Sequence, residues 1–273
     1  MALERLSLSG KVAVVTGAGR GLGRQMALAL AKAGAHVVVA ARTQAQIDAV
    51  AAEIEELSSG QRALAVQTDV RDPRRVDALI ARCLDEFGRL DVMLSNAGIG
   101  ESWAAGRELA GIADDDWRTS IELNLSSVFY CARAASKPMT EQGGGVIINV
   151  SSGTALRGFP QDMAYNAAKA GVLSLTKSLA LMLMRHNIRV NCIIPGFVNQ
   201  TPAQTAEEAE RRRQRARFVP VQRLGEAWEL GPLAVFLASD ASSYLTGQGI
   251  AIDGGGLAGG YAPVGFAPNV IIA

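Results

Sequence analysis

The most constraining feature of this sequence is the regular alternation of two kinds of segment. Short, continuously apolar runs predict buried strands, and the longer stretches between them carry apolar residues at helical spacing. The predicted strands span residues 11–16, 36–41, 62–67, 91–95, 145–150, 188–194 and 249–252. The predicted helices span residues 21–33, 43–57, 73–87, 115–137, 163–186 and 226–238.

This alternation predicts an α/β fold. Strands that are apolar on both faces belong to parallel sheets covered by helices on both sides. We therefore expect a single doubly wound Rossmann-type domain over residues 1–273, with a parallel sheet of about seven strands. Right-handed crossovers then place the ligand crevice at the carboxyl ends of the strands.

Composition excludes several other classes of protein. The chain has 27 basic and 26 acidic residues, a net charge of +1, so it has no overall electrostatic attraction to nucleic acid. A net charge near zero with 49% hydrophobic residues also argues against intrinsic disorder. Three dispersed cysteines and two histidines predict no disulfide framework, no metal site and no histidine-based triad. The N-terminal residues lack a signal-peptide pattern, and the uncharged stretch 254–273 is too rich in glycine and proline for a membrane helix. We expect a cytoplasmic protein without membrane or nucleic-acid partners.

Three segments depart from the alternation. Residues 99–113 form a long loop, and residues 201–218 combine a capping box at Thr205 and Glu208 with five arginines. Because this second segment has few apolar anchors, we expect it to be a mobile lid with a solvated charged face. The C-terminal tail, residues 257–273, is apolar, and we expect it to pack near the crevice or against a neighbouring subunit, with a frayed end as the alternative.

The turn after the first predicted strand has the sequence TGAGRGLG, residues 16–23. Its glycines allow a tight turn and a close approach of backbone N–H groups to a pyrophosphate, and the following helix adds its positive N-terminal dipole. The spacing is not the strict GxGxxG, because Leu22 interrupts it. The placement of the turn nevertheless predicts a dinucleotide site.

The end of the second strand indicates which dinucleotide is bound. Ala41 stands where an acidic residue would accept hydrogen bonds from the adenosine ribose, and Arg42 follows it. A cation at this place suits a 2′-phosphate, and Arg20 in the glycine-rich turn supplies a second one. We therefore expect NADP(H) as the cofactor.

Tyr165 and Lys169 form the only Tyr-x-x-x-Lys pair in the chain. On a helix this spacing puts both side chains on one face, where the ammonium group is expected to lower the pKa of the phenol and make it a general acid and base. Ser151 and Ser152 close the fifth strand, where a serine hydroxyl could hydrogen-bond a substrate carbonyl. Asn124 lies in the long helix before that strand.

At this point the chain resembles the short-chain dehydrogenase/reductase family, from about residue 6 to residue 255. The family's motifs occur here in their usual order: TGAGRGLG at 16–23, TDV at 68–70, SNAG at 95–98, Asn124 in ELNLSS, Ser152 thirteen residues before Tyr165, YNAAK at 165–169, PG at 195–196 and DGG at 253–255.

The resemblance implies a role for each matching residue. Tyr165 would be the proton donor or acceptor, Lys169 would bind the nicotinamide ribose, Ser152 would orient the carbonyl, and Asn124 would hold a water in a proton relay. Asp69 would contact the adenine, and the backbone at Val198 the carboxamide. The cofactor-binding residues would be Gly17, Gly19, Arg20, Gly21, Leu22, Gly23, Arg42, Asp69, Val70, Asn96, Ala97, Gly98, Tyr165, Lys169, Pro195, Gly196 and Val198. The resemblance also implies a homotetramer, or a homodimer, paired through helices 115–137 and 163–186.

Two departures from the family pattern concern the cofactor site. Ser95 replaces the first asparagine of the usual NNAG, and Gln200 stands where a threonine normally follows PG. The expected activity is an NADP-dependent interconversion of ketones and secondary alcohols. The alternatives are a 3-oxoacyl carrier-protein reductase, a polyol or sugar dehydrogenase and, from another class, a non-catalytic NADP sensor. A sensor would not need Asn124, Ser152, Tyr165 and Lys169 together.

Overall fold

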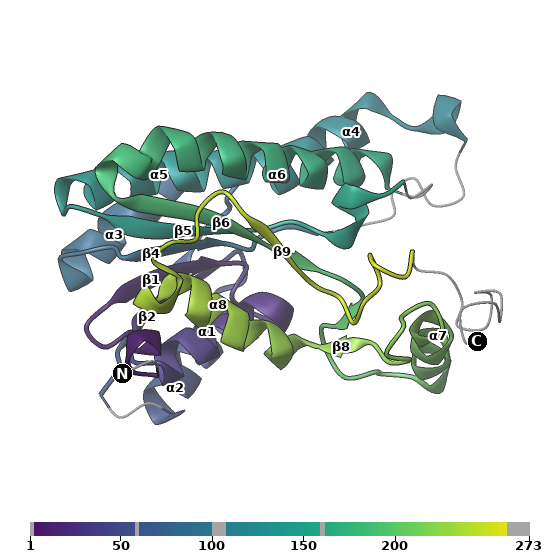
Figure 1. Ribbon diagram of the computed structural model, residues 1–273, viewed down its shortest axis with the longest axis horizontal. Coiled ribbons are helices and arrows are strands. Elements are labelled where there is room, and N and C mark those ends of the chain that lie inside the picture. Colours follow the sequence, from purple (N-terminus) through teal and green to yellow (C-terminus); the bar gives the residue numbers. More distant parts are fainter. Residues whose placement is uncertain (1–2, 58–59, 100–107, 159–161, 261–273) are drawn as a thin grey trace.

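The structure is a computed structural model, which describes residues 3–57, 60–99, 108–158 and 162–260. Its centre is a seven-stranded parallel sheet in the order β3-β2-β1-β4-β5-β6-β9 (Figure 1). The strands are β1 (Val12–Thr16), β2 (His36–Ala41), β3 (Ala63–Gln67), β4 (Val92–Ser95), β5 (Gly145–Val150), β6 (Ile188–Pro195) and β9 (Gly249–Ile252). All seven predicted strands are present, each within one residue of its expected ends, which confirms the predicted fold class.

Helices cover both faces of the sheet (Figure 1). One layer consists of α1 (Gly21–Lys32), α2 (Gln44–Leu57) and α8 (Leu230–Ala238), and the other of α3 (Pro73–Phe87), α5 (Ser127–Glu141) and α6 (Met163–Leu183). Successive strand residues supply the two cores in turn: Ala13 and Val15 pack against the first layer, and Val12 and Val14 against the second. This is why the strands are apolar at every position rather than at every second one.

Local sequence signals explain the helix ends. The carboxylate of Asp72 accepts a hydrogen bond from the N–H of Arg74 at 2.9 Å, as expected for the N-cap of α3, and Pro73 opens that helix. The helix expected from Glu226 begins instead as a 3-10 turn, Ala227–Glu229, before α8. The helix expected over 115–137 is α4 (Asp114–Ile121) joined to α5 by a π-helical turn, Glu122–Ser126.

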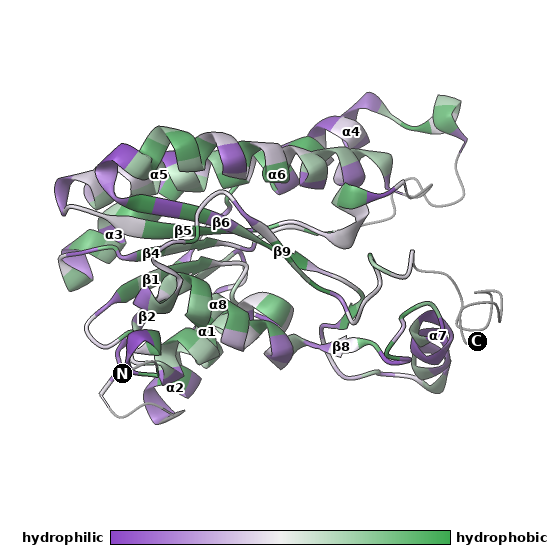
Figure 2. Cartoon of the chain, in the orientation of Figure 1, coloured by the Kyte–Doolittle hydropathy of each residue, from purple (hydrophilic) through white to green (hydrophobic). Residues whose placement is uncertain are grey.

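A small lobe extends beyond the carboxyl ends of the strands. It holds α7 (Ala206–Ala216) and a two-stranded ladder of β7 (Val198–Asn199) and β8 (Gly225–Glu226). Helix α7 has no buried residue and is strongly polar (Figure 2). The expected pairs Glu207–Arg211 and Glu208–Arg212 are formed at 2.6 and 2.5 Å, so most of the charge run is a solvated helix face.

The remaining expectations concern cysteines, membranes and termini. Cys83, Cys131 and Cys192 are buried and free, as small core residues are. Within the described residues, Met163–His186 is long and apolar enough to cross a membrane by composition, but it packs against β6 as a helix of the core does. Trp103 and Phe159, two apolar residues that the sequence offers as candidates for the substrate side, lie outside the described residues, as do residues 261–273 of the tail. The described part of the tail packs Leu257 against Val219 and Leu224.

Candidate active site

The glycine-rich turn lies where the strand order reverses, between β1 and β4. Gly17 and Gly21 have φ values of +65° and +58°, a backbone conformation that glycine adopts at little cost. At Gly23 a Cβ atom would lie 2.3 Å from the carbonyl oxygen of Gly17, so no side chain fits. The side-chain Nδ2 of Asn96 donates to the backbone carbonyl oxygens of Thr16 and Gly17, at 3.0 and 3.3 Å, and holds the turn in place.

A cleft of about 520 Å³ runs from this turn across the ends of the strands to α6. Of the residues that the resemblance assigned to the cofactor, those that line it are Gly17, Gly19, Arg20, Leu22, Gly23, Arg42, Asp69, Val70, Asn96, Ala97, Gly98, Tyr165, Lys169, Pro195, Gly196 and Val198. Gly21 does not line the cleft but begins α1, whose N-terminus faces it. The open cradle and the helix N-terminus fit a pyrophosphate.

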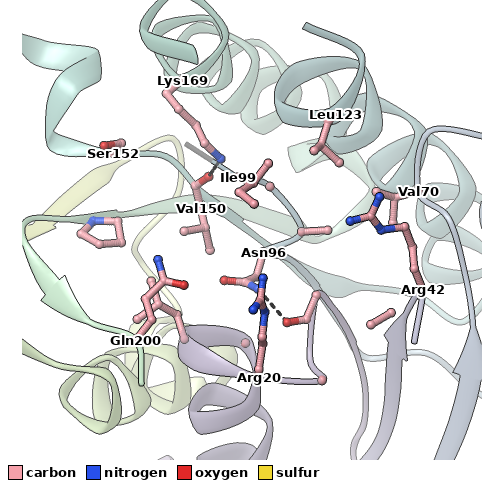
Figure 3. A pocket seen from close by; sticks show the side chains of 18 of the residues that line it. Arg20, Arg42, Val70, Asn96, Ile99, Leu123, Val150, Ser152, Lys169 and Gln200 are labelled. Carbon is pink, nitrogen blue, oxygen red and sulfur yellow. Dashed lines mark hydrogen bonds between the residues drawn. The ribbon is translucent and has the colours of Figure 1, made fainter. Parts of the chain in front are cut away.

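Three charged side chains stand at one end of the cleft. Arg20 comes from the glycine-rich turn and Arg42 directly follows β2; in Figure 3 Arg20 lies below Lys169 and Arg42 to its right. Asp69 also lines the cleft, and its carboxylate accepts hydrogen bonds from the guanidinium of Arg71, the shortest at 2.6 and 3.0 Å, and from the backbone N–H of Arg71 at 3.1 Å. The side-chain hydrogen bond from Arg71 keeps the pKa of Asp69 below its usual range. The carboxylate is therefore already paired with Arg71.

Ser152, Tyr165 and Lys169 meet at the other end of the cleft. The Nζ of Lys169 donates to the carbonyl oxygen of Val150 at 2.9 Å (Figure 3) and lies 5.6 Å from the centre of the Tyr165 ring. Ser151 has a different task, because its hydroxyl donates to the carbonyl oxygen of Lys169 at 2.7 Å. Of the two serines, Ser152 is thus the one whose side chain lies at the hydroxyl of Tyr165, while Ser151 binds the backbone of α6.

Burial has the largest effect on the pKa values of Tyr165 and Lys169. The pKa of Tyr165 is raised, mainly because burial disfavours the phenolate, although the hydrogen bond with Ser152 acts in the opposite direction. The pKa of Lys169 is lowered to about 8, also by burial. The expectation that Lys169 lowers the pKa of Tyr165 is therefore wrong for this structure. The ammonium group of Lys169 donates its hydrogen bond to the carbonyl oxygen of Val150. Burial of Lys169 also disfavours the charged form of its side chain.

Thr154 is a site residue that the sequence analysis missed. Its side-chain hydroxyl donates to the Oγ of Ser152 at 3.1 Å, and its backbone N–H donates to the same oxygen at 3.3 Å. An oxygen that accepts two hydrogen bonds has its own proton left to donate. Thr154 thereby turns Ser152 into a hydrogen-bond donor. Only its position two residues after Ser152 could have drawn attention to it.

Asn124 is fully buried and does not line the cleft. Its side-chain amide accepts from the N–H of Ile99 at 3.0 Å and donates to the carbonyl oxygens of Ile99 and Ser120. It belongs to the π-helical turn, a kind of distortion that is frequent at functional sites. Asn124 thus fixes the loop beside Lys169, while its place in a proton relay stays a prediction.

Gln200 also lines the cleft, as do Ile99 and Leu123, which the sequence analysis did not single out. Gln200 lies over the start of α1: a Cβ atom on Gly21 would be 3.1 Å from its side-chain oxygen (Figure 3). Gln200, which stands in place of the family's threonine, thus puts a polar side chain beside the glycine-rich turn.

Comparison with known proteins decides the family. The family model described as enoyl-(acyl carrier protein) reductase matches residues 17–256. The chain belongs to the short-chain dehydrogenase/reductase family. Members of this family use nicotinamide cofactors, which agrees with the position of the glycine-rich turn and the cleft.

Individual relatives cover nearly the whole chain. A 3-oxoacyl-(acyl-carrier-protein) reductase from Synechocystis sp. is 41% identical over 253 residues, 91% of this chain and 98% of that protein. A 2-dehydro-3-deoxy-D-gluconate 5-dehydrogenase from Escherichia coli is 39% identical over 263 residues, 94% of this chain and 100% of that protein. The crystal structure of L-sorbose reductase from Gluconobacter frateurii, complexed with NADPH and L-sorbose, has a TM-score of 0.86 at 32% identity, covering 93% of this chain and 98% of that one. These relatives are oxidoreductases that act on carbonyl or alcohol groups.

Proposed function

We propose that this short-chain dehydrogenase/reductase interconverts a ketone and a secondary alcohol with NADP(H). The observation that carries the proposal is the arrangement of the cleft. Ser152, Tyr165 and Lys169 line one of its ends and the glycine-rich turn lies at the other, so a dinucleotide on the turn would extend to the three side chains. A non-catalytic sensor has no use for this arrangement.

The chain's own residues hold the carbonyl and supply a proton. The Ser152 hydroxyl, with its proton left free by Thr154, donates to the substrate carbonyl oxygen. The Tyr165 hydroxyl gives that oxygen a proton during reduction and takes it back during oxidation. Lys169, at the same end of the cleft, would hold the nicotinamide ribose. A bound nicotinamide would supply the hydride for reduction and accept it in oxidation.

The preference for NADP(H) rests on charge at the far end of the cleft. Arg20 and Arg42 are both exposed, and Ala41 has no carboxylate to offer the ribose. Asp69 is the acidic side chain in the described lining of this cleft, and its charge is already paired with Arg71. A phosphate on the ribose therefore meets two cations whose charge Asp69 does not cancel.

The experiment is an assay of NADPH and NADH oxidation with a panel of ketones, using wild type, Tyr165→Phe and Arg42→Asp. Tyr165→Phe should keep cofactor affinity and lose about 100-fold or more in turnover, the usual scale for a general acid. Arg42→Asp should weaken NADPH binding by about 2–4 kcal/mol and leave NADH little affected. Turnover of Tyr165→Phe within tenfold of wild type, or a wild type that prefers NADH, would contradict the respective assignment.

The relatives favour two more specific activities. The Synechocystis protein supports a 3-oxoacyl carrier-protein reductase, and the Escherichia coli and Gluconobacter proteins support a polyol or sugar dehydrogenase. An acyl thioester, a sugar and a simple cyclic ketone in the same panel would separate the three candidates by kcat/KM. We further propose that the protein acts in the cytoplasm as a homotetramer or homodimer.

A further inference from the structure

Behind the acidic residue of the cleft stands an arginine that has no assigned role. Asp69 lies in the turn after β3 and lines the cleft, whereas Arg71, two residues later, is not part of the lining. The side chain of Arg71 is half-buried, with 39% of it exposed. Arg71 also lies outside the motifs that the chain shares with its family. Any effect of Arg71 on a bound dinucleotide therefore passes through Asp69.

Arg71 binds both carboxylate oxygens of Asp69. Its Nη2 donates to Oδ2 at 2.6 Å and its Nε to Oδ1 at 3.0 Å. Its backbone N–H also donates to Oδ1, at 3.1 Å. A bidentate pair of a guanidinium and a carboxylate has a fixed geometry and is stronger than a single neutral hydrogen bond. The carboxylate of Asp69 is thus held at both oxygens by one residue.

The same carboxylate is also within the electrostatic reach of Arg42. Both arginines lower the pKa of Asp69, but the side-chain hydrogen bond from Arg71 has the largest effect and the charge of Arg42 the smallest. Arg42 is exposed, and among the described residues its side chain forms no hydrogen bond and no ion pair. The guanidinium of Arg42 can therefore turn either to Asp69 or to a phosphate in the cleft.

We propose that Arg71 is a specificity-determining residue for NADP(H), because it keeps Asp69 from pairing with Arg42. This rests on the proposed function, since it concerns the cofactor preference of the same site. Without the guanidinium of Arg71, Asp69 loses its side-chain partner, and Arg42 is another cation whose charge reaches it. The carboxylate then draws Arg42 away from the 2′-phosphate and adds a negative charge beside that phosphate. Arg71 is a positioning residue, because it acts through Asp69 and Arg42.

A purely structural role for Arg71 makes a different prediction. If its side chain only fastens the turn between β3 and α3, its removal disturbs this side of the cleft and weakens the binding of NADPH and NADH alike. A role in specificity instead shows as a loss of NADPH binding alone, since NADH has no phosphate on its adenosine ribose. That loss also disappears when Asp69 is made neutral. The ratio of the two dissociation constants therefore separates the two roles.

The test measures the dissociation constants of NADPH and NADH, through the fluorescence of the reduced nicotinamide, for wild type and four variants. Arg71→Met should weaken NADPH binding by about 5- to 20-fold, because one cation is withdrawn from the phosphate, and leave NADH binding within about threefold of wild type. Arg71→Lys keeps the charge without the bidentate geometry and should lie between the two. Asp69→Asn should keep or raise the preference for NADPH. The double variant Arg71→Met/Asp69→Asn should have a preference within about threefold of Asp69→Asn, because no carboxylate is left to draw Arg42 away.

Arg74→Met is the matched control. Arg74 also pairs with an aspartate, Asp72, but its side chain is 92% exposed and does not line the cleft, so this variant should bind both cofactors as wild type does.

Three outcomes would overturn the inference while wild type still prefers NADPH and the proposed function stays in place. The first is an unchanged preference in Arg71→Met, whether both cofactors bind as in wild type or both bind more weakly. The second is a double variant with as low a preference as Arg71→Met. The third is a lower preference in Asp69→Asn, which can be measured even if Arg71→Met does not fold. A wild type that binds NADH as tightly as NADPH would overturn the proposed cofactor preference and the inference together.

Discussion

At the scale of single residues, the site depends on where protons are held. Ser152 has a hydroxyl whose oxygen accepts two hydrogen bonds from Thr154, so its proton is directed to the cleft. The hydroxyl of Ser151, one residue earlier, donates a hydrogen bond to the backbone carbonyl oxygen of Lys169. Two adjacent, chemically identical side chains thus have different functions because their partners differ.

The role of Thr154 can be tested with two substitutions of similar size. Thr154→Val keeps the shape but removes the hydroxyl that donates to Ser152, so kcat should fall by about 5- to 20-fold, the effect of misdirecting one hydrogen bond. Thr154→Ser keeps the donor and should stay within about threefold of wild type. Steady-state kinetics at several pH values measure both. Equal kcat for the valine and serine variants would show that the hydroxyl is not needed.

Lys169 makes the stability of the protein without cofactor depend on pH. Burial lowers its pKa to about 8 from the ordinary value of 10.5, so between these values the unfolded chain binds more protons than the folded one. The contribution of Lys169 to the free energy of unfolding therefore rises with pH between these two pKa values, because the cost of burying the charged side chain disappears as it loses its proton. From pH 7 to pH 9 the free energy of unfolding should gain about 1 kcal/mol relative to Lys169→Met.

Urea denaturation of both proteins at pH 7, 8 and 9 measures this difference. Comparison with the variant is needed because three buried thiols also titrate: burial raises the pKa of Cys83, Cys131 and Cys192 to about 12. These thiols act in the opposite direction but are present in both proteins. A constant difference between wild type and Lys169→Met over the three pH values would mean that Lys169 is not buried in its charged form.

At the scale of elements, one arginine joins a strand to a helix end. Arg189 on β6 donates to the carbonyl oxygens of Leu237 and Ser239, both at 3.0 Å, and to the hydroxyl of Ser242 at 2.9 Å. The last carbonyls of a helix have no partner within the helix, and its C-terminus favours a cation. Arg189 thus caps α8 from the neighbouring sheet, and burial lowers its pKa.

Arg189→Met should therefore destabilise the fold by about 2–4 kcal/mol, because several buried acceptors lose a charged donor. A suitable control is Arg118→Met, since Arg118 is 70% exposed and pairs with Asp115 on the surface of α4. That change should cost less than about 1 kcal/mol. Chemical denaturation of the two variants would measure the contrast, and a similar loss in both would contradict the capping role.

At the scale of the whole molecule, α6 serves two surfaces. One face packs on the sheet and presents Tyr165 and Lys169 to the cleft, and the other leaves Leu181 and Met182 exposed by 74% and 63%. Exposed apolar side chains that gather on one helix mark association surfaces in soluble proteins. This is the surface on which the proposed homotetramer or homodimer depends.

Leu181→Glu should reduce the number of subunits in the assembly, because a charge would be buried between protomers. Leu109→Glu is a matched control: Leu109 is equally exposed, at 74%, but lies in a short 3-10 turn outside α5 and α6. Light scattering coupled to size exclusion measures the molar mass of each variant. An unchanged mass for Leu181→Glu would remove this helix from the interface.

The fold, the glycine-rich turn and the Tyr165–Lys169 pair could be predicted from the sequence because each rests on local order. Apolar runs specify buried strands wherever they occur, glycines specify a turn that side chains would block, and four residues along a helix bring two side chains to one face. The helix expected over 115–137 was predicted as regular, and the π-helical turn at Asn124 was missed, because its bonds to Ile99 lie 25 residues away.

Only the tertiary structure decided what surrounds those groups. Burial, and not the neighbouring lysine, controls the pKa of Tyr165, and Gln200 reaches the glycine-rich turn from a segment that follows β6. Arg157, in the loop after β5, donates to the carbonyl oxygen of Gly260, a contact across 103 residues. Desolvation and contacts between distant segments depend on the packing of the whole chain, and no local pattern of residues contains them.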